Sequence, residues 1–318
     1  MSYEKTVWAG EGTLAREQEY NYHWCYERGI ITKAWLDVHA ATGDRRFYDA
    51  AKANVDQYVT EDGAILTYEP EKYNLDMICM GRTALRLFKA TGEAKYEKAC
   101  RRLIEQIKGQ PTTAEGGFWH KKLYPQQMWL DGIYMACPFL TEFAVTFGEM
   151  QWADLAAKQM ELIFEKTRLE SGLHAHAWDS AKAQKWADPR TGLSPHVWGR
   201  AMGWFVMAHA DVLAALPESH PDYAQLSLQM KSLLTAVMAA RGADKLWHQV
   251  MDRPESEENY AESSCSAMFI YGLAKGKALG LCGAKEEAAA RESMDALWQK
   301  NVVTAADGYP ELTRICKV

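Results

Sequence analysis

Apolar residues recur along this chain at helical spacing, in units that each begin with a turn. The segment ATGDRRFYDAAKAN, which contains Gly43, is repeated as ATGEAKYEKACRRL around Gly92 and more loosely as TFGEMQWADLAAKQM around Gly148. In each copy the glycine suits the left-handed C-terminal cap of one helix, and acidic residues suit the first turn of the next. Later segments that start at Leu216 and Leu279 have the same form. The pattern therefore predicts a series of helical hairpins.

The length of the repeat predicts the architecture. Each hairpin takes roughly 50 to 70 residues, as in stacked or closed helical arrays, so about six units fit into the 318 residues. Six hairpins can close into an all-α (α/α)6 barrel, a six-hairpin toroid, although spacing alone does not distinguish a closed ring from an open solenoid. Proline is rare and no Ser/Gly-rich linker interrupts the chain, so we expect one domain over residues 1–318. Only residues 63–68 and 245–250 resemble short strands.

Composition and charge exclude several classes of function. The 36 Lys and Arg and 42 Asp and Glu residues give a net charge of −6. This negative charge does not favour binding to nucleic acid or to an anionic membrane. We find no apolar core of a secretory signal and no run of ~18 apolar residues that could span a membrane. The seven cysteines are scattered without a CxxC pair, which predicts free thiols in a reducing cytoplasm.

Tryptophan is abundant, and its placement is informative. The chain has 12 Trp and 15 Tyr beside only 9 Phe, and amphipathic aromatic residues favour binding surfaces. Many tryptophans lie between the repeats, where loops and inner-helix termini usually build sites. We expect those on the repeat helices to pack the core and the others to line a pocket. The expected pocket group is Trp24, Trp119, Trp129, Trp178, Trp198, Trp204 and Trp247.

Two aspartates are candidate acids. Asp76 follows Asn74, which can cap a helix starting near Leu75, so Asp76 either compensates the helix dipole or serves a site. Asp131 lies in an almost wholly apolar run that Pro125 could open as a helix. A carboxylate in such a run is either paired or has a raised pKa, and a raised pKa suits a general acid. A structural aspartate bonded to a neighbouring loop is the alternative.

Three further segments carry candidate polar residues. His174 and His176 form an HxH, but further ligands at interpretable spacing are missing, so no zinc site is expected. Arg200 and Trp204 share a helix face, which suits an anionic ligand and a stacked sugar ring; a buried Arg–Asp pair with a core Trp is the alternative. Glu262 and the serines after it suit a helix cap.

Several of these segments also carry a family resemblance. The matching motifs are NLD at 74–76, HKK at 120–122, QMWLDGIYMACPFL at 127–140, HAWD at 176–179, WGRAMGW at 198–204 and ESSCSAMF at 262–269. In this order, from about Tyr22 to Leu312, the chain resembles the unsaturated rhamnogalacturonyl hydrolases, glycoside hydrolase family 105. It is more distantly similar to the unsaturated glucuronyl hydrolases of family 88. The resemblance implies an (α/α)6 barrel, in agreement with the repeats.

The resemblance implies a hydrolase that removes an unsaturated uronic acid from the non-reducing end of a small pectin fragment. That sugar has a C4=C5 double bond, and the family hydrates this enol ether: an acid protonates C4, water adds at C5, and the hemiketal rearranges and releases the neighbouring sugar. By motif, Asp131 would be the acid and then the base for water, and Asp76 a second carboxylate nearby. His176, Arg200 and Trp204 match contacts to the unsaturated sugar, His120 and Lys121 match positions near its carboxylate, and Tyr26 is a looser match.

The implied partner is a small anionic oligosaccharide, with no nucleic acid and no membrane. Because the protein is acidic overall, Arg200, Lys121 and the histidines would supply local positive charge. A proton donor to carbon must stay protonated near neutral pH, which Asp131 beside a second carboxylate could do. The motif HKK leaves open which of its lysines faces the ligand. No metal, nucleotide or flavin cofactor is expected, and we find no GxGxxG or P-loop segment.

Three alternatives remain open from the sequence. An unsaturated glucuronyl hydrolase acting on glycosaminoglycan fragments would share the fold and differ in the sugar after the scissile bond. A sugar epimerase on the same fold would use two histidines as acid and base, such as His176 and His248. A non-catalytic helical scaffold would not explain why Trp, His and isolated Asp residues concentrate between the repeats.

Overall fold

The computed structural model describes residues 3–17 and 23–317, and eleven α-helices make up most of them. They are α1 (Tyr3–Ala15), α2 (Tyr26–Thr42), α3 (Arg45–Asp56), α4 (Gly81–Thr91), α5 (Ala94–Gly109), α6 (Leu130–Phe147), α7 (Gln151–Thr167), α8 (Gly199–Ala215), α9 (Tyr223–Ala239), α10 (Ser263–Ala278) and α11 (Ala284–Asn301). The predicted all-α class is confirmed. Tyr22, where the family resemblance begins, lies outside the described residues.

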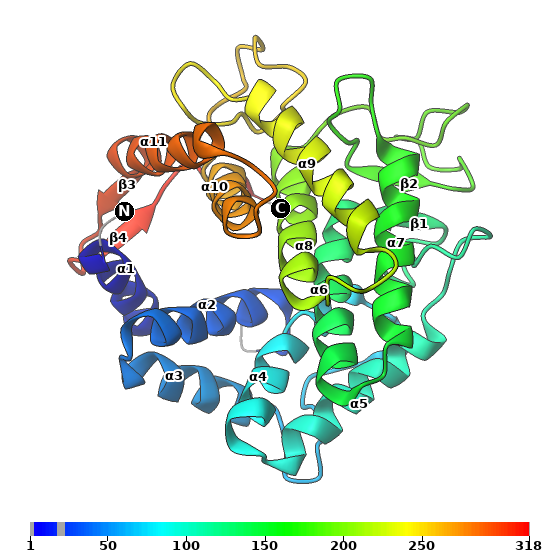
Figure 1. The fold of residues 1–318 in the computed structure, drawn as a ribbon, viewed down its shortest axis with the longest axis vertical. Coiled ribbons are helices and arrows are strands. Elements are labelled where there is room, and N and C mark those ends of the chain that lie inside the picture. Colours follow the sequence, from blue (N-terminus) through cyan, green and yellow to red (C-terminus); the bar gives the residue numbers. More distant parts are fainter. Residues whose placement is uncertain (1–2, 18–22, 318) are drawn as a thin grey trace.

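Consecutive helices form hairpins arranged around a ring (Figure 1). The even-numbered helices from α2 to α10 lie toward the centre, and the odd-numbered helices from α3 to α11 lie outside them. The repeat predicted about six hairpins, whereas the described residues contain five, and α1 takes the sixth place between α11 and α2. The architecture is the predicted (α/α)6 barrel.

The glycines of the repeat end the helices as predicted. Gly43 follows α2, Gly92 follows α4 and Gly148 follows α6, with φ angles of 73°, 72° and 70°. Each is a left-handed cap whose N–H returns to a carbonyl of the last helical turn. Since a side chain would strain this conformation, the turn-then-helix pattern along the chain marks the hairpins directly.

A buried polar network joins four of the inner helices. Arg82 of α4 donates to Asp211 of α8 at 2.8 Å, to Glu142 of α6 and, at 3.3 Å, to the hydroxyl of Tyr134 in α6. The hydroxyl of Tyr271, on α10, donates to the other oxygen of Asp211. Burial raises the pKa of Asp211, but the charge of Arg82 outweighs it and brings this pKa to about 2. The ring is thus held together by paired charges as well as apolar packing.

The short strands lie outside the helical hairpins. Strand β1 (Gln127–Trp129) pairs antiparallel with β2 (Ala177–Asp179), and β3 (Val302–Thr304) pairs with β4 (Pro310–Leu312). The prediction that Pro125 opens a helix was wrong, because residues 127–129 pair as a strand and α6 begins only at Leu130. Residues 63–68 and 245–250, predicted as strands, contribute only isolated bridges.

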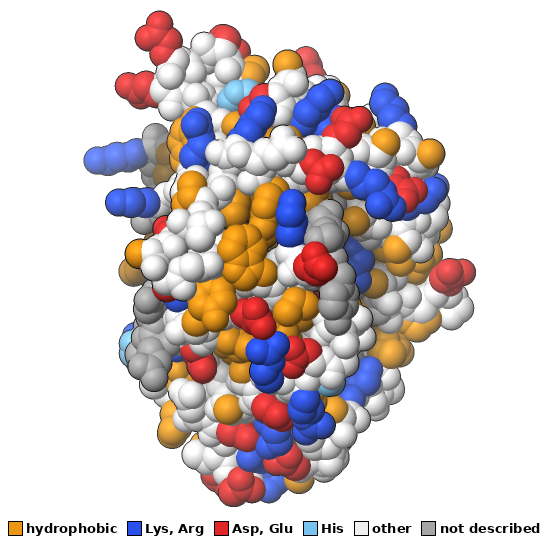
Figure 2. Space-filling view, turned by 90° about the vertical axis from the view of Figure 1, so that its left-hand side faces the viewer, with side chains coloured by type: hydrophobic (Ala, Val, Ile, Leu, Met, Phe, Trp, Pro, Cys, Tyr) orange, Lys and Arg blue, Asp and Glu red, His pale blue; other side chains and the backbone are white. Residues whose placement is uncertain are grey.

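The ring closes where α1 meets α11 and the β3–β4 hairpin. A groove of about 820 Å³ lies here, lined by apolar residues such as Leu297 and Trp298. Figure 2 shows this face, with apolar side chains gathered in its middle among charged ones. Arg16 of the segment after α1 bridges the groove to Asp307 through two 2.7 Å hydrogen bonds.

The remaining general expectations concern membranes and thiols. Across residues 3–17 and 23–317, no helix combines the length and apolar character needed to cross a bilayer. All seven cysteines are described, and each is a free thiol as predicted.

Candidate active site

Four of the predicted site residues lie in the first turns of inner elements. Asp131 is the second residue of α6 and Arg200 the second residue of α8. Asp76 is the second residue of the 3₁₀ helix η3 (Leu75–Ile78), which precedes α4, and Tyr26 is the first residue of α2. Several helix N-termini therefore contribute to one site, and their exposed N–H groups and dipoles favour an anionic ligand.

Asp131 is hydrogen-bonded to His176. The β1–β2 pairing sets Trp129 opposite Ala177, and the N–H of Leu130 donates to the carbonyl of His176 at 3.0 Å. These backbone contacts place His176 Nε2 2.9 Å from Asp131 Oδ2. Burial raises the pKa of Asp131, but the charge and hydrogen bond of His176 outweigh burial and bring this pKa below its usual value. Of the two alternatives drawn from the sequence, a paired carboxylate or one with a raised pKa, the structure shows the paired one.

Asp76 lies in a second charged group beside the first. Asn74 Oδ1 accepts the N–H of Asp76, so the predicted cap is confirmed. Lys121 Nζ lies 2.7 Å from one carboxylate oxygen of Asp76, and His120 Nε2 lies 3.4 Å from the other. Lys122 instead faces the ring of Tyr73. The structure thus identifies Lys121 as the lysine of HKK that faces the site.

His120 is buried between the two carboxylates. Burial lowers its pKa, although the charges of Asp76 and Asp131 act in the opposite direction. Its ring stacks on Trp129, with centroids 4.7 Å apart and planes 14° apart, and its Nδ1 atom has no hydrogen-bond partner. Because the lowered pKa favours neutral imidazole at pH 7, His120 offers hydrogen bonds rather than the positive charge expected from the sequence.

Arg200 closes the site from α8. Its Nε atom donates to Ser264 Oγ at 3.0 Å, and Nη2 donates to the carbonyl of Cys316. Within the described residues no carboxylate pairs with Arg200, so the alternative of a buried Arg–Asp pair was wrong for this residue. Glu262 caps α10 as predicted and also accepts the N–H of Cys316. The guanidinium is thus held by neutral groups and keeps its positive charge for an anion.

Trp204 lies one turn after Arg200 and is 5% exposed. Its ring stacks on Tyr134 at 4.9 Å and meets the edge of Tyr26 at 6.3 Å. Burial and the charges of Glu27 and Asp76 raise the pKa of Tyr26, whereas the charge of Arg200 acts against this shift. The Tyr26 hydroxyl therefore lies within electrostatic reach of both Asp76 and Arg200, and connects the two sides of the site.

Two tryptophans that the sequence predicted to line a pocket surround His176. Trp129 and Trp198 are the N-caps of α6 and α8, and their rings lie 5.3 Å and 5.0 Å from the His176 ring in edge contacts. Each lies two positions before a candidate site residue, Trp129 before Asp131 and Trp198 before Arg200. By contrast Trp24 and Trp247, predicted to line the pocket, are fully buried in the core.

The HxH motif divides into one core residue and one site residue. His174 is buried against Phe164 and Phe205, and its Nδ1 atom is hydrogen-bonded to Thr167 at 2.9 Å. Burial lowers the pKa of His174 to about 3. Since alternate residues of an extended segment point to opposite sides, His174 faces the core and His176 faces the site.

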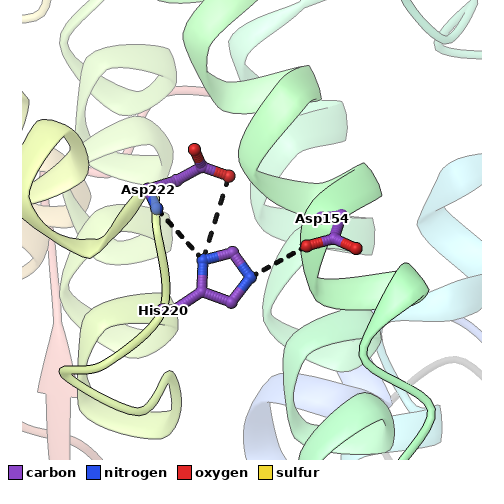
Figure 3. Close-up of side chains that lie close together, drawn as sticks. All are labelled: Asp154, His220 and Asp222. Atoms are coloured by element: carbon purple, nitrogen blue, oxygen red, sulfur yellow. Dashed lines mark hydrogen bonds and ion pairs between the residues drawn. The ribbon is translucent and has the colours of Figure 1, made fainter.

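Asp154, His220 and Asp222 are the one group of three close potential metal ligands in the part of the chain that the structure describes (Figure 3). His220 Nε2 lies 3.0 Å from Asp154, and Nδ1 accepts the N–H of Asp222 at 3.2 Å. The two carboxylates thus face opposite ring nitrogens, and both nitrogens are already hydrogen-bonded. This arrangement ties α7 to the start of α9 and does not suit one ion.

The two histidines of the epimerase alternative are not brought together. His248 forms a bridge with Ala261 and lines a separate cavity with Asn259 and Lys300. In the described residues no hydrogen bond or ring contact joins His248 to His176, which is paired with Asp131. The geometry therefore favours carboxylate chemistry over a two-histidine mechanism.

Comparison with known sequences identifies the family of this chain. The model of Glycosyl Hydrolase Family 88 matches residues 6–318. The chain is 35% identical to protein Atu3128 of Agrobacterium fabrum over 188 residues, which are 58% of this chain and 80% of that protein. It is 25% identical to the unsaturated rhamnogalacturonyl hydrolase YesR of Bacillus subtilis over 279 residues, 85% of this chain and 76% of that protein.

Comparison with solved structures extends the match. A glycoside hydrolase of family 105 from C. acetobutylicum superposes with a TM-score of 0.94 at 36% identity, covering 98% of this chain and 88% of that one. The unsaturated glucuronyl hydrolase of Bacillus sp. GL1, at 13% identity and a TM-score of 0.72, covers 99% of this chain and 89% of that one and shares the fold. The chain therefore belongs to the glycosyl hydrolases of families 88 and 105 and is a glycoside hydrolase with an (α/α)6 barrel.

Proposed function

We propose that this protein removes the 4,5-unsaturated galacturonic acid from the non-reducing end of rhamnogalacturonan fragments left by a polysaccharide lyase. The observation that carries the proposal is the Asp131–His176 pair beside the Asp76–Lys121 pair, both at the first turns of inner elements. The resemblance to YesR, an unsaturated rhamnogalacturonyl hydrolase, supports the substrate class. Asp131 and Asp76 provide carboxylates for proton transfer, and Arg200 and Lys121 provide charge for the sugar carboxylate.

The proposed reaction is hydration of the double bond. Asp131 gives a proton to C4, which leaves positive charge shared between C5 and the ring oxygen. Water adds at C5 and returns its proton to Asp131, so the carboxyl group is restored. The resulting hemiketal opens to a ketone at C5, and the ring oxygen becomes a hydroxyl on C1. C1 is then a hemiacetal, which breaks down to an aldehyde and releases the neighbouring sugar. The balance is one water consumed, and no oxidant or reductant is needed.

His176 brings the pKa of Asp131 below its usual value in the free protein, so we propose that Asp131 takes up its proton when the substrate binds. A bound uronate brings a negative charge and expels water, and both effects raise the pKa of a neighbouring carboxyl. The 2.9 Å hydrogen bond to His176 gives a short path for the proton. Asp76, held by Lys121 at 2.7 Å, is the second carboxylate of the proposed site and orients the sugar.

The test is the ultraviolet absorbance of the conjugated C4=C5 bond. We expect the absorbance to fall when the enzyme meets unsaturated galacturonyl-rhamnose, and one solvent deuterium to appear at C4 of the product. Turnover of an unsaturated chondroitin disaccharide without turnover of the rhamnose compound would favour the glucuronyl hydrolase alternative. Release of the sugar without deuterium at C4 would contradict hydration.

A further inference from the structure

Glu262, directly before α10, carries a fully buried carboxylate that accepts hydrogen bonds from four donors. The N–H groups of Ser264 and Cys316 donate to Oε1 at 3.1 and 3.0 Å, and the N–H of Cys265 donates to Oε2 at 2.7 Å. The hydroxyl of Ser264 donates to both oxygens at 2.9 Å. Within residues 3–17 and 23–317 no Lys, Arg or His side chain pairs with Glu262, so neutral donors alone satisfy this carboxylate.

Two of these donors belong to groups that also hold Arg200. Ser264 Oγ accepts the N–H of Arg200 Nε at 3.0 Å, and the carbonyl of Cys316 accepts from Nη2. Because an ionised carboxylate only accepts hydrogen bonds, the hydroxyl hydrogen of Ser264 points to Glu262 and leaves the oxygen lone pairs for Arg200. Glu262 thus orients both groups that hold the guanidinium, although no hydrogen bond in the described part of the chain joins it to Arg200 directly.

The guanidinium of Arg200 keeps one nitrogen for a ligand. Nε and Nη2 are occupied, whereas no hydrogen bond among the described residues occupies Nη1. Its Cζ atom lies 5.4 Å from the centroid of the Trp198 ring. Two held nitrogens and this ring together fix the guanidinium plane and the direction of Nη1. Such fixed orientation is what a carboxylate requires of an arginine partner.

The C-terminal segment, residues 313–317, has a second attachment to α10 that does not involve Glu262. The carbonyl of Arg314 accepts the N–H of Ser263 at 3.0 Å, and the carbonyl one residue earlier accepts the Ser263 hydroxyl. This attachment should keep the segment in place when the contact with Glu262 is lost. A change at Glu262 should therefore alter the orientation of Arg200 rather than release the segment.

We infer that Glu262 is a positioning residue for substrate binding: by holding Ser264 and Cys316, it orients Arg200 toward the carboxylate of the bound sugar. The inference rests on the proposed function, which supplies an anionic substrate. It goes further by assigning the geometry of the anion site to a buried residue that acts through Arg200.

Glutamine does not reproduce the contacts of Glu262. Each carboxylate oxygen accepts a backbone N–H, that of Cys316 on Oε1 and that of Cys265 on Oε2. In Glu262→Gln one of these oxygens becomes an NH2 donor, so either orientation of the amide sets two donors against each other. In both orientations the NH2 group also faces the hydroxyl of Ser264. The variant keeps the volume of the side chain and disturbs the groups that hold Arg200.

The experiment is a double-mutant cycle with unsaturated galacturonyl-rhamnose as substrate. Glu262→Gln should lower kcat/KM about tenfold through a higher KM, with kcat within about threefold of wild type. In the background of Arg200→Gln the same change should lower kcat/KM less than about twofold, because the guanidinium that Glu262 positions is absent. A structural role independent of Arg200 would give the same loss in both backgrounds.

The matched control is Asp179→Asn. Asp179 is 1% exposed and accepts three backbone N–H groups, and none of its hydrogen bonds in the described residues leads to Arg200. Any loss that this variant causes should be equal in the wild-type and Arg200→Gln backgrounds. If Glu262→Gln does not fold, Ser264 provides the test: Ser264→Ala should lose about tenfold in kcat/KM, and Ser264→Thr, which keeps the hydroxyl, should stay within about threefold of wild type.

Two results would overturn the inference while leaving the proposed function intact. One is an equal loss from Glu262→Gln with and without Arg200, or no loss at all. The other is an equal effect of Ser264→Ala and Ser264→Thr. If wild type turns over no unsaturated uronide, the proposed function itself fails and the inference falls with it.

Discussion

Asp131 and His176 lie 45 positions apart in the chain, and a 2.9 Å hydrogen bond joins Asp131 Oδ2 to His176 Nε2. Two paired three-residue strands bring these residues together. Their register places Trp129 opposite Ala177, next to Asp131 and His176 in the chain. The pair therefore combines a helix first turn, which favours an anion, with an imidazole that can hold the proton. The predictions below follow from this pair and from the charged groups around it.

Asp131→Asn should lower kcat by about 10²- to 10⁴-fold, because the amide cannot give a proton to carbon or take one from water. The side chain keeps nearly the same volume, so the thermal unfolding temperature should stay near that of wild type. Absorbance loss with the unsaturated disaccharide measures the rate, and circular dichroism checks the fold. Activity within a few-fold of wild type would remove Asp131 from the mechanism.

His176→Asn should raise the pKa of Asp131, because burial then acts without the opposing charge of the imidazole. The direct measurement is the carboxyl carbon shift of Asp131 in a pH titration by NMR. A pKa of Asp131 that stays the same or falls in this variant would contradict the assigned cause.

The same variant should change how stability depends on pH. A carboxyl whose folded pKa is lowered stabilises the fold above the unfolded value of about 3.9, and this contribution is lost as the pH falls through the folded pKa. The unfolding free energy of wild type should therefore decrease more steeply on acidification below about pH 4 than that of His176→Asn. Asp211, whose pKa is about 2, is present in both proteins and cancels in the comparison. Urea unfolding at pH 6 and pH 3 gives the two slopes, and parallel slopes would count against the prediction.

Arg200→Gln should raise KM for the anionic substrate by about ten- to hundredfold, because its guanidinium is held by Ser264 and Cys316 without a neutralising carboxylate. Arg200→Lys keeps the positive charge but loses the two parallel N–H donors of the guanidinium. Its KM should therefore lie between those of wild type and Arg200→Gln. Steady-state kinetics at several salt concentrations measure the effect. A KM unchanged in Arg200→Gln would show that the sugar carboxylate binds elsewhere.

Arg82→Met should destabilise the fold by about 3–5 kcal/mol, because it leaves the buried Asp211 and the half-buried Glu142 without their partner. Replacing all three residues together, as Arg82→Met with Asp211→Asn and Glu142→Gln, should recover part of this loss. Urea denaturation of the two variants measures both quantities. A loss below about 1 kcal/mol for Arg82→Met alone would mean that the network contributes little to the ring.

Local sequence patterns predicted the helix ends correctly but not the number of hairpins. The caps at Gly43, Gly92 and Gly148 depend only on a backbone conformation that glycine adopts without strain, so the sequence marked them correctly. The cap at Asn74 is equally local and was also predicted correctly. The sequence predicted a sixth hairpin, but α1 occupies that position as a single helix. Dividing the chain length by the repeat length could not show this.

Contacts distant in sequence accounted for the differences at the site. Pro125 suited a helix start on local rules, but pairing with residues 177–179 draws residues 127–129 into a strand. Trp247 resembled a pocket residue by its proximity to His248, yet its indole donates to the carbonyl of Val237 deep in the core. Trp186, which was given no role from the sequence, lines a cavity with Trp129 and His176, and Asp179 holds the start of its loop by accepting the N–H of Ala183.

The sequence by itself determined the helical repeat, the class of enzyme through its ordered motifs, and the set of polar residues that surround the site. Only the tertiary structure decided which of them are partners: Asp131 with His176, Asp76 with Lys121, and Arg200 with the neutral groups of α10 and the C-terminal segment. The reason is physical. A pKa and a charge partner depend on burial and on distances across the ring, and these are set by packing between segments that no local pattern connects.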